Sequence, residues 1–206
     1  MKKIFIATVI VSLFTGCSVK TVPIPNSGAN LRGKSITYVK KSSPKRPYFY
    51  TDSNVIGNAV GGFIGGLIEG VGDSKKYSAT YEVPSNQLAQ RLTPIIASKY
   101  GMQYASNANL KNSVDYILDV DTGGWMMQHI TLLRDTARFI MRNDVKLKNA
   151  KTDRTVAQVM CLYKKEWKDN VPKYEDILAN NHQFVKNYTQ KAIDECIRKV
   201  QTQMLK

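Results

Sequence analysis

The residues of this chain that could act as acids, bases or nucleophiles are few and widely spaced. His129 and His182 are its two histidines, and neither lies in a motif such as Gly-x-Ser-x-Gly or His-Glu-x-x-His. A hydrolase needs a nucleophile with a base within reach, and no such pattern surrounds either histidine. We therefore expect both to be ordinary surface or core residues, and we expect no catalytic residue and no cofactor.

Three carboxylates, Asp115, Asp119 and Asp121, lie close together in the sequence. Their odd-numbered spacing places them on one face of an expected strand, opposite its apolar residues. Such a cluster suits general acid–base work or Ca²⁺ binding. The alternative is a solvated strand face that pairs with Arg138 or Arg142 on a neighbouring strand. We favour ion pairing and expect no metal site.

The start of the chain has the three parts of a secretory signal. Lys2 and Lys3 are positive, residues 4–14 are apolar, and two small residues precede Cys17. An apolar run of this length is well short of the ~20 residues that span a bilayer, so we do not expect a permanent anchor helix. Residues 1–16 are therefore predicted to be a signal peptide.

The tetrad Phe-Thr-Gly-Cys at residues 14–17 resembles the lipobox of bacterial lipoproteins. The resemblance implies that the thiol of Cys17 is acylated, with palmitate as a typical chain, although Phe14 stands where Leu is usual. Ser18, in place of Asp, implies sorting to the outer membrane, with the protein lipid-anchored and facing the periplasm. The alternative is an ordinary cleaved signal with an incidental cysteine.

The charge of the chain is strongly positive and unevenly distributed. Lys and Arg number 30 against 16 Asp and Glu, and residues 17–50 hold seven of these bases and no acid. A basic segment directly after a lipid anchor is expected to lie against anionic head groups. Nucleic acid is the usual partner of a basic chain, but an exported lipoprotein seldom meets it, so we expect none. The alternative is a solvated basic surface that maintains solubility.

Cys161 and Cys196 are the remaining cysteines. In an oxidising periplasm an even pair indicates a disulfide, and both fall on apolar faces, one of an expected strand and one of an expected helix. The alternatives are two separate buried thiols or a metal site, and neither histidine has ligand spacing to these cysteines.

A glycine-rich stretch at residues 54–72 has Gly57, Gly61 and Gly65 at four-residue intervals. On a helix this spacing leaves a groove of bare backbone that a second helix can approach closely. The segment therefore suggests membrane insertion or self-association as a homo-oligomer. The alternative is a glycine-rich loop or short helix packed on the domain, because each Gly costs a helix up to ~1 kcal/mol relative to Ala.

Hydrophobic periodicity predicts an α+β fold, with a mainly antiparallel sheet of about four strands covered by two main helices. A flexible lipidated tether at 17–33 precedes a single periplasmic domain at 34–206, which holds the glycine-rich insertion. Ser85 is the predicted N-cap of the first helix, and Gly123-Gly124 is predicted to interrupt the second strand. The expected strands are 34–41, 114–120, 137–147 and 155–163, and the expected helices are 85–101 and one beginning near 174.

The mature chain resembles a family of uncharacterised Gram-negative envelope lipoproteins. The resemblance rests on residues 114–120, Trp125, Asp153, 157–161, 174–181 and Cys196. The layout is more distantly similar to lipoprotein domains of the curli-secretion type. Trp125 and the methionines after it are candidates for an exposed binding lip, with core packing as the alternative.

We therefore predict a non-enzymatic outer-membrane lipoprotein that binds another envelope component, either a protein or peptidoglycan. One alternative is a subunit of an oligomeric secretion or pore complex that uses residues 54–72. The other is a periplasmic enzyme of unrecognised type.

Overall fold

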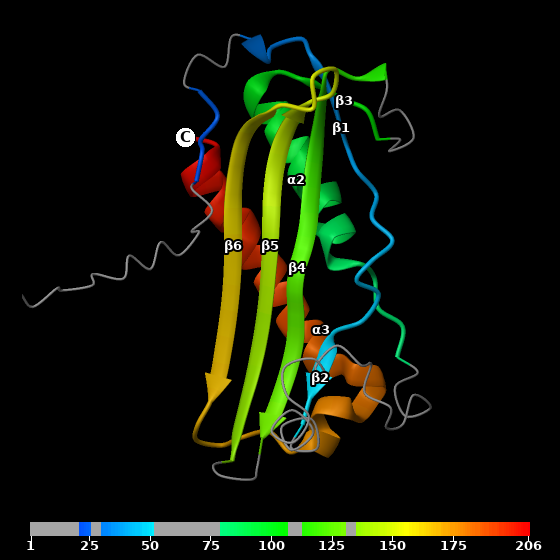
Figure 1. The fold of residues 1–206 in the computed structure, drawn as a ribbon, viewed down its shortest axis with the longest axis vertical. Coiled ribbons are helices and arrows are strands. Elements are labelled where there is room, and N and C mark those ends of the chain that lie inside the picture. The colour runs from blue at the N-terminus through cyan, green and yellow to red at the C-terminus, as the bar shows by residue number, and fades with distance from the viewer. Residues whose placement is uncertain (1–20, 26–29, 52–78, 107–112, 131–134) are drawn as a thin grey trace, which may run out of the picture.

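The computed structural model describes residues 21–25, 30–51, 79–106, 113–130 and 135–206 (Figure 1). Cys17, Gly57, Gly61 and Gly65 lie outside these ranges. The predicted α+β class is confirmed. The elements in chain order are β1 (Ser35–Tyr38), β2 (Tyr48–Tyr50), α2 (Pro84–Tyr100), β3 (Gln103–Tyr104), β4 (Tyr116–Ile130), β5 (Thr136–Asn149), β6 (Thr155–Trp167), α3 (Tyr174–Lys199) and a π-helical turn, η4 (Val200–Met204).

Three long antiparallel strands form the centre of the sheet. The strand order is β3-β1-β4-β5-β6, and β2 also pairs with β4. Strict alternation along β5 buries every second side chain, which is why its sequence pattern predicted it. The sheet holds more strands than predicted because β1, β2 and β3 are short pieces that pair in parallel.

The sequence predicted that the glycine pair interrupts the second strand, and this prediction is wrong. β4 continues through Gly123 and Gly124 with a register shift at this point. The extra residue moves the inward set from even positions, Leu118 and Val120, to odd positions, Trp125 and Met127. A Cβ on Gly123 would lie 3.6 Å from an Asp144 carboxylate oxygen, so the bulge sits where the neighbouring strand comes close.

Both helices cover one face of the sheet, behind the strands in the view of Figure 1. Helix α2 begins at Pro84 with Val83 as its N-cap, so the predicted cap at Ser85 is wrong. Proline is favoured in the first helical turn because its missing N–H would have no partner there. The helix ends at Tyr100, and Gly101 follows as its cap with a left-handed φ of 62°.

Helix α3 begins at Tyr174, as predicted, but it is not one regular helix. Residues 179–182 depart from helical geometry, and Asn180, Asn181 and His182 all have positive φ. Asparagine tolerates this left-handed conformation better than most residues. At the break Asn181 is exposed and His182 is buried. The buried side of the helix therefore changes between residues 180 and 182.

The domain begins earlier than residue 34. Val22 forms an antiparallel bridge with Gln158 of β6, with N–H···O distances of 2.8 Å in both directions. Ile24 donates to the Met204 carbonyl and is 1% exposed, and Leu31 is also buried. Part of the predicted tether is therefore fixed to the domain, because these two apolar side chains complete its core.

Candidate functional site

The three aspartates of the predicted cluster form ion pairs on the face of the sheet that the helices do not cover. Lys41 Nζ lies 2.7 Å from Asp119 and 3.2 Å from Asp121, and Lys148 Nζ lies 3.2 Å from Asp119. Asp115 accepts hydrogen bonds from the Ser35 backbone and hydroxyl. Ion pairing is therefore confirmed, although the partners are lysines.

The predicted arginine partners lie in other pairs. Arg138 binds Glu166 at 2.6 Å, and Arg142 binds Asp144 at 2.8 Å. Cross-strand register explains the difference, because Arg138 and Arg142 stand opposite Gln128 and Gly124 on β4, beyond the three aspartates. Burial would raise the pKa of the Asp119 carboxyl, but hydrogen bonds and charge from Lys41 and Lys148 outweigh it and lower this pKa.

We call this uncovered side of β4, β5 and β6 the open face. Most of its cations are paired: Lys164 also binds Glu166, at 2.8 Å, whereas Lys146 has no carboxylate partner among the described residues. Between the ion pairs lie apolar side chains. Tyr48 is 71% exposed and Leu162 is 55% exposed. Met126 of β4 lies between Tyr48 of β2 and Ile140 of β5 in the strand register. The open face thus combines neutralised charges with exposed apolar groups, a composition that suits contact with another macromolecule.

His182 lies in the core, at the break in α3. Its Nδ1 is 2.6 Å from the Tyr81 hydroxyl, and the ring of Phe49 contacts it edge-on at 5.4 Å. Desolvation, aided by the nearby charge of Lys186, lowers the pKa of His182. His129 Nε2 is 3.9 Å from Asp135, which is beyond hydrogen-bond range. His182 is therefore a core residue, and His129 is a partly buried residue near Asp135.

Trp125 is 1% exposed, so core packing is the correct alternative and the exposed lip is wrong. Its indole N–H donates to Thr189 Oγ1 at 3.0 Å, and Tyr81 packs edge-on against it at 5.2 Å. A pocket of about 410 Å³ lies beside this group, lined in part by Lys186, Gln87 and Gln190. Its lining holds polar side chains that can form hydrogen bonds, but no histidine or cysteine.

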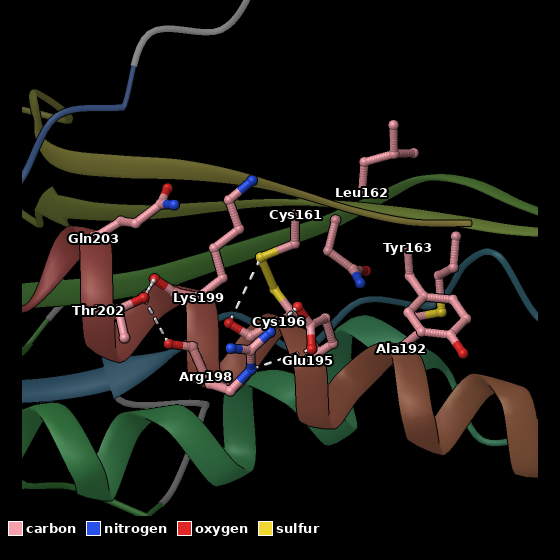
Figure 2. A pocket seen from close by; sticks show the side chains of 12 residues that line it. Cys161, Leu162, Tyr163, Ala192, Glu195, Cys196, Arg198, Lys199, Thr202 and Gln203 are labelled. Atoms are coloured by element: carbon pink, nitrogen blue, oxygen red, sulfur yellow. Dashed lines mark hydrogen bonds and ion pairs between the residues drawn. A yellow bond between two sulfur atoms is a disulfide. The ribbon is translucent and has the colours of Figure 1, made fainter. Parts of the chain in front are cut away.

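The predicted disulfide is present. The sulfurs of Cys161 and Cys196 are bonded at 2.00 Å, which joins β6 to α3. Both residues are buried. Beside the bond lies a pocket of about 300 Å³, and Figure 2 shows Lys199 extending over it from α3 towards β6. Arg198, Thr202 and Gln203 complete the helix side of this pocket.

A group of aromatic and basic residues follows the junction of β6 and α3, and the sequence analysis missed it. The aromatic rings of Trp167, Phe184 and Tyr188 lie within 5.4 Å of one another. We call this surface the seam; its residues are Tyr163, Lys165 and Trp167 of β6 with Phe184, Tyr188, Lys191, Glu195, Arg198 and Lys199 of α3. The signal that could have revealed it is the alternation at 163, 165 and 167 together with the helical spacing 184, 188, 191, 195 and 198.

The bases of residues 17–50 that the structure describes lie on different parts of the domain. Lys41 is neutralised by two aspartates on the open face. Lys45 and Arg46 lie between β1 and β2, beside β4, at the side of the sheet away from β6 and Val22 (Figure 1). The expectation that this segment lies against anionic head groups stays a prediction.

The described residues contain no group of three or more His, Cys, Asp or Glu side chains arranged to hold a metal ion. Within the same residues, no helix is long and apolar enough to cross a membrane.

No protein-family model and no curated protein matches the sequence. Among solved structures, the chain is similar to the minor lipoprotein of Acinetobacter baumannii, at 13% identity over 58% of this chain and 82% of that chain, with a TM-score of 0.39. It is also similar to lipoprotein GNA1162 of Neisseria meningitidis, at 8% identity over 80% and 99%, with a TM-score of 0.32.

A third similar structure is the PelC dodecamer of Paraburkholderia phytofirmans, at 9% identity over 80% of this chain and 89% of that chain, with a TM-score of 0.34. The first two neighbours are lipoproteins of Gram-negative bacteria, the class that the sequence resembles. At TM-scores of this size, the function has to be decided by the chain's own residues.

Proposed function

We propose that this chain is an outer-membrane lipoprotein, acylated at Cys17 and facing the periplasm, that binds another envelope component without catalysis. The observation that carries the binding role is the open face. Both described helices pack on the other side of the sheet, so within the described residues no helix covers the open face of three strands of 13 to 15 residues. A protein or a peptidoglycan strand fits a surface of this extent better than a small molecule does.

The anchored location is supported by the signal at residues 1–16 and by the buried disulfide, which suits an oxidising compartment. Labelling with radioactive palmitate tests it. The wild-type chain should incorporate label and fractionate with the outer membrane, and Cys17→Ser should lose the label. Equal labelling of both chains, or none in either, would overturn the anchored role.

The binding role is tested by photocrosslinking in intact cells. A photoreactive amino acid at Ile140, on the open face, should give a discrete higher-mass product. The same amino acid at Gln183, exposed on α3, is the matched control and should give none. Identical products at both sites, or no product at Ile140, would contradict binding through the open face.

The oligomer alternative stays a prediction, because residues 54–72 lie outside the described residues.

A further inference from the structure

We propose that the seam docks on the anionic phospholipid head groups of the membrane that holds the anchor. This proposal rests on the proposed function for the origin of the membrane, and it assigns a second, separate surface to the lipid. The open face then stays free for the partner.

The first support is where the chain enters the domain. Cys17 is five residues before Val22, and Val22 is bonded to Gln158 at the outer edge of β6. Five residues reach at most about 17 Å, at about 3.5 Å each. The acylated end therefore stays near the edge strand β6 (Figure 1), the strand that also contributes Tyr163, Lys165 and Trp167 to the seam.

The second support is charge. The seam holds Lys165, Lys191, Arg198 and Lys199 against the single carboxylate of Glu195, a net charge of +3. Arg198 pairs with Glu195. Across the part of the chain that the structure describes, the other three cations have no carboxylate within ion-pair distance. They are therefore available for lipid phosphates, whereas on the open face Lys41, Arg138, Arg142, Lys148 and Lys164 already pair with carboxylates and only Lys146 does not.

The third support is the chemistry of the rings beneath these cations. Lys191 Nζ lies 4.6 Å from the centre of the Tyr188 ring, and Lys165 Nζ lies 5.7 Å from that of Trp167. Tyr163, Trp167, Phe184 and Tyr188 are all half-buried. Half-exposed aromatic rings beside lysines are the composition that settles at a membrane interface, with the rings at head-group depth and the ammonium groups at the phosphates.

The pocket beside the disulfide adds a place for one head group. Its helix side presents Lys199 and Gln203, whose side chains can donate hydrogen bonds to phosphate oxygens. The apolar sulfurs are buried beneath. A phosphate could therefore be held at the surface without entering the core.

The test uses the mature chain carrying Cys17→Ser, which has no acyl chain, in co-sedimentation with vesicles. Phosphatidylcholine vesicles containing phosphatidylglycerol should bind it, and phosphatidylcholine alone should not. In the seam variant Lys191→Gln/Lys199→Gln, binding should weaken roughly thirtyfold, since each basic residue beside an anionic surface contributes about 1 kcal/mol. The matched control, Lys45→Gln/Arg46→Gln, removes the same charge from the opposite side of the sheet and should change binding less than threefold.

Equal losses in the two variants would show that net charge alone drives binding, and would overturn the proposal. No binding to the anionic vesicles would do the same. Brominated phosphatidylglycerol supplies an independent measurement, because the chain has only Trp125 and Trp167. Quenching should persist in Trp125→Phe and disappear in Trp167→Phe; the reverse result contradicts docking through the seam.

These outcomes are separate from those of the palmitate experiment. Absence of palmitate labelling in the wild-type chain would overturn the anchored role and leave the vesicle result standing. Failure of the vesicle experiment in a chain that is labelled would overturn only the docking surface.

Discussion

The open face and the seam are both rich in basic residues, but their cations have different surroundings. On the open face, Arg138 and Arg142 each lie against a carboxylate. On the seam, Lys165 and Lys191 lie over aromatic rings instead. Strand geometry produces the first arrangement, because Arg138 stands opposite Glu166 on the neighbouring strand, and Arg142 and Asp144 share one face of β5. The comparison teaches that the position of the acids, more than the number of bases, decides which surface attracts anions.

The largest expected effect concerns the covalent bond beneath the seam. Cys161→Ala/Cys196→Ala should lower the free energy of unfolding by roughly 3–4 kcal/mol, because the bond closes a loop of about 35 residues in the unfolded chain. Urea denaturation measures this change, with Cys17→Ser as the control that leaves the bond intact. The unfolded, unreduced Cys17→Ser chain should also show no free thiol. A change below about 1 kcal/mol in the double variant would mean that the bond contributes little.

The second largest expected effect on stability concerns the aromatic rings, which differ in burial between the seam and the open face. Trp167→Ala removes a half-buried ring from the Phe184–Tyr188 group and should cost about 2–3 kcal/mol, somewhat less than a fully buried ring. Tyr48→Ala removes a ring from the open face, where it is 71% exposed, and should change stability by less than about 0.5 kcal/mol. Thermal unfolding of both variants provides the comparison. Similar costs would contradict the assignment of Trp167 to a packed cluster.

A smaller effect than that of Trp167→Ala belongs to the ion pairs of the open face. Because the pKa of Asp119 is lower in the folded chain, its contribution to stability is complete above the unfolded pKa of about 3.9 and is lost as the pH falls through the folded value. Asp119→Asn should therefore cost about 0.5–1 kcal/mol at neutral pH and less at strongly acidic pH. Denaturation across the acid range measures this difference. A cost that does not change with pH would show that Lys41 and Lys148 do not stabilise the charged form.

Much of the fold could be predicted because long strands repeat their pattern locally. The alternation along β5 and the capping glycine after α2 depend on neighbouring residues only. Two irregularities could not be predicted: the bulge at Gly123 and the break in α3 at Asn180. Each depends on an element that packs against it and is distant in the sequence. A bulge also exchanges even for odd inward positions, which in the sequence looks like the end of a strand.

The candidate surfaces were harder to predict than the fold. The disulfide could be predicted because both cysteines fall on apolar faces of regular elements. The partners of Asp119 could not, because Lys41 is 78 residues away in the chain. The seam joins alternate residues of a strand to a stripe on a helix, so neither segment shows it alone.

The bridge between Val22 and Gln158 also limits the space available to the domain. A free segment from 17 to 33 would reach about 60 Å, whereas the five residues before the bridge reach about 17 Å. The volume accessible around the anchor therefore falls about fortyfold, and the effective concentration of the domain beside the head groups rises by the same factor. A surface that binds lipid only weakly in solution would then be occupied for much of the time.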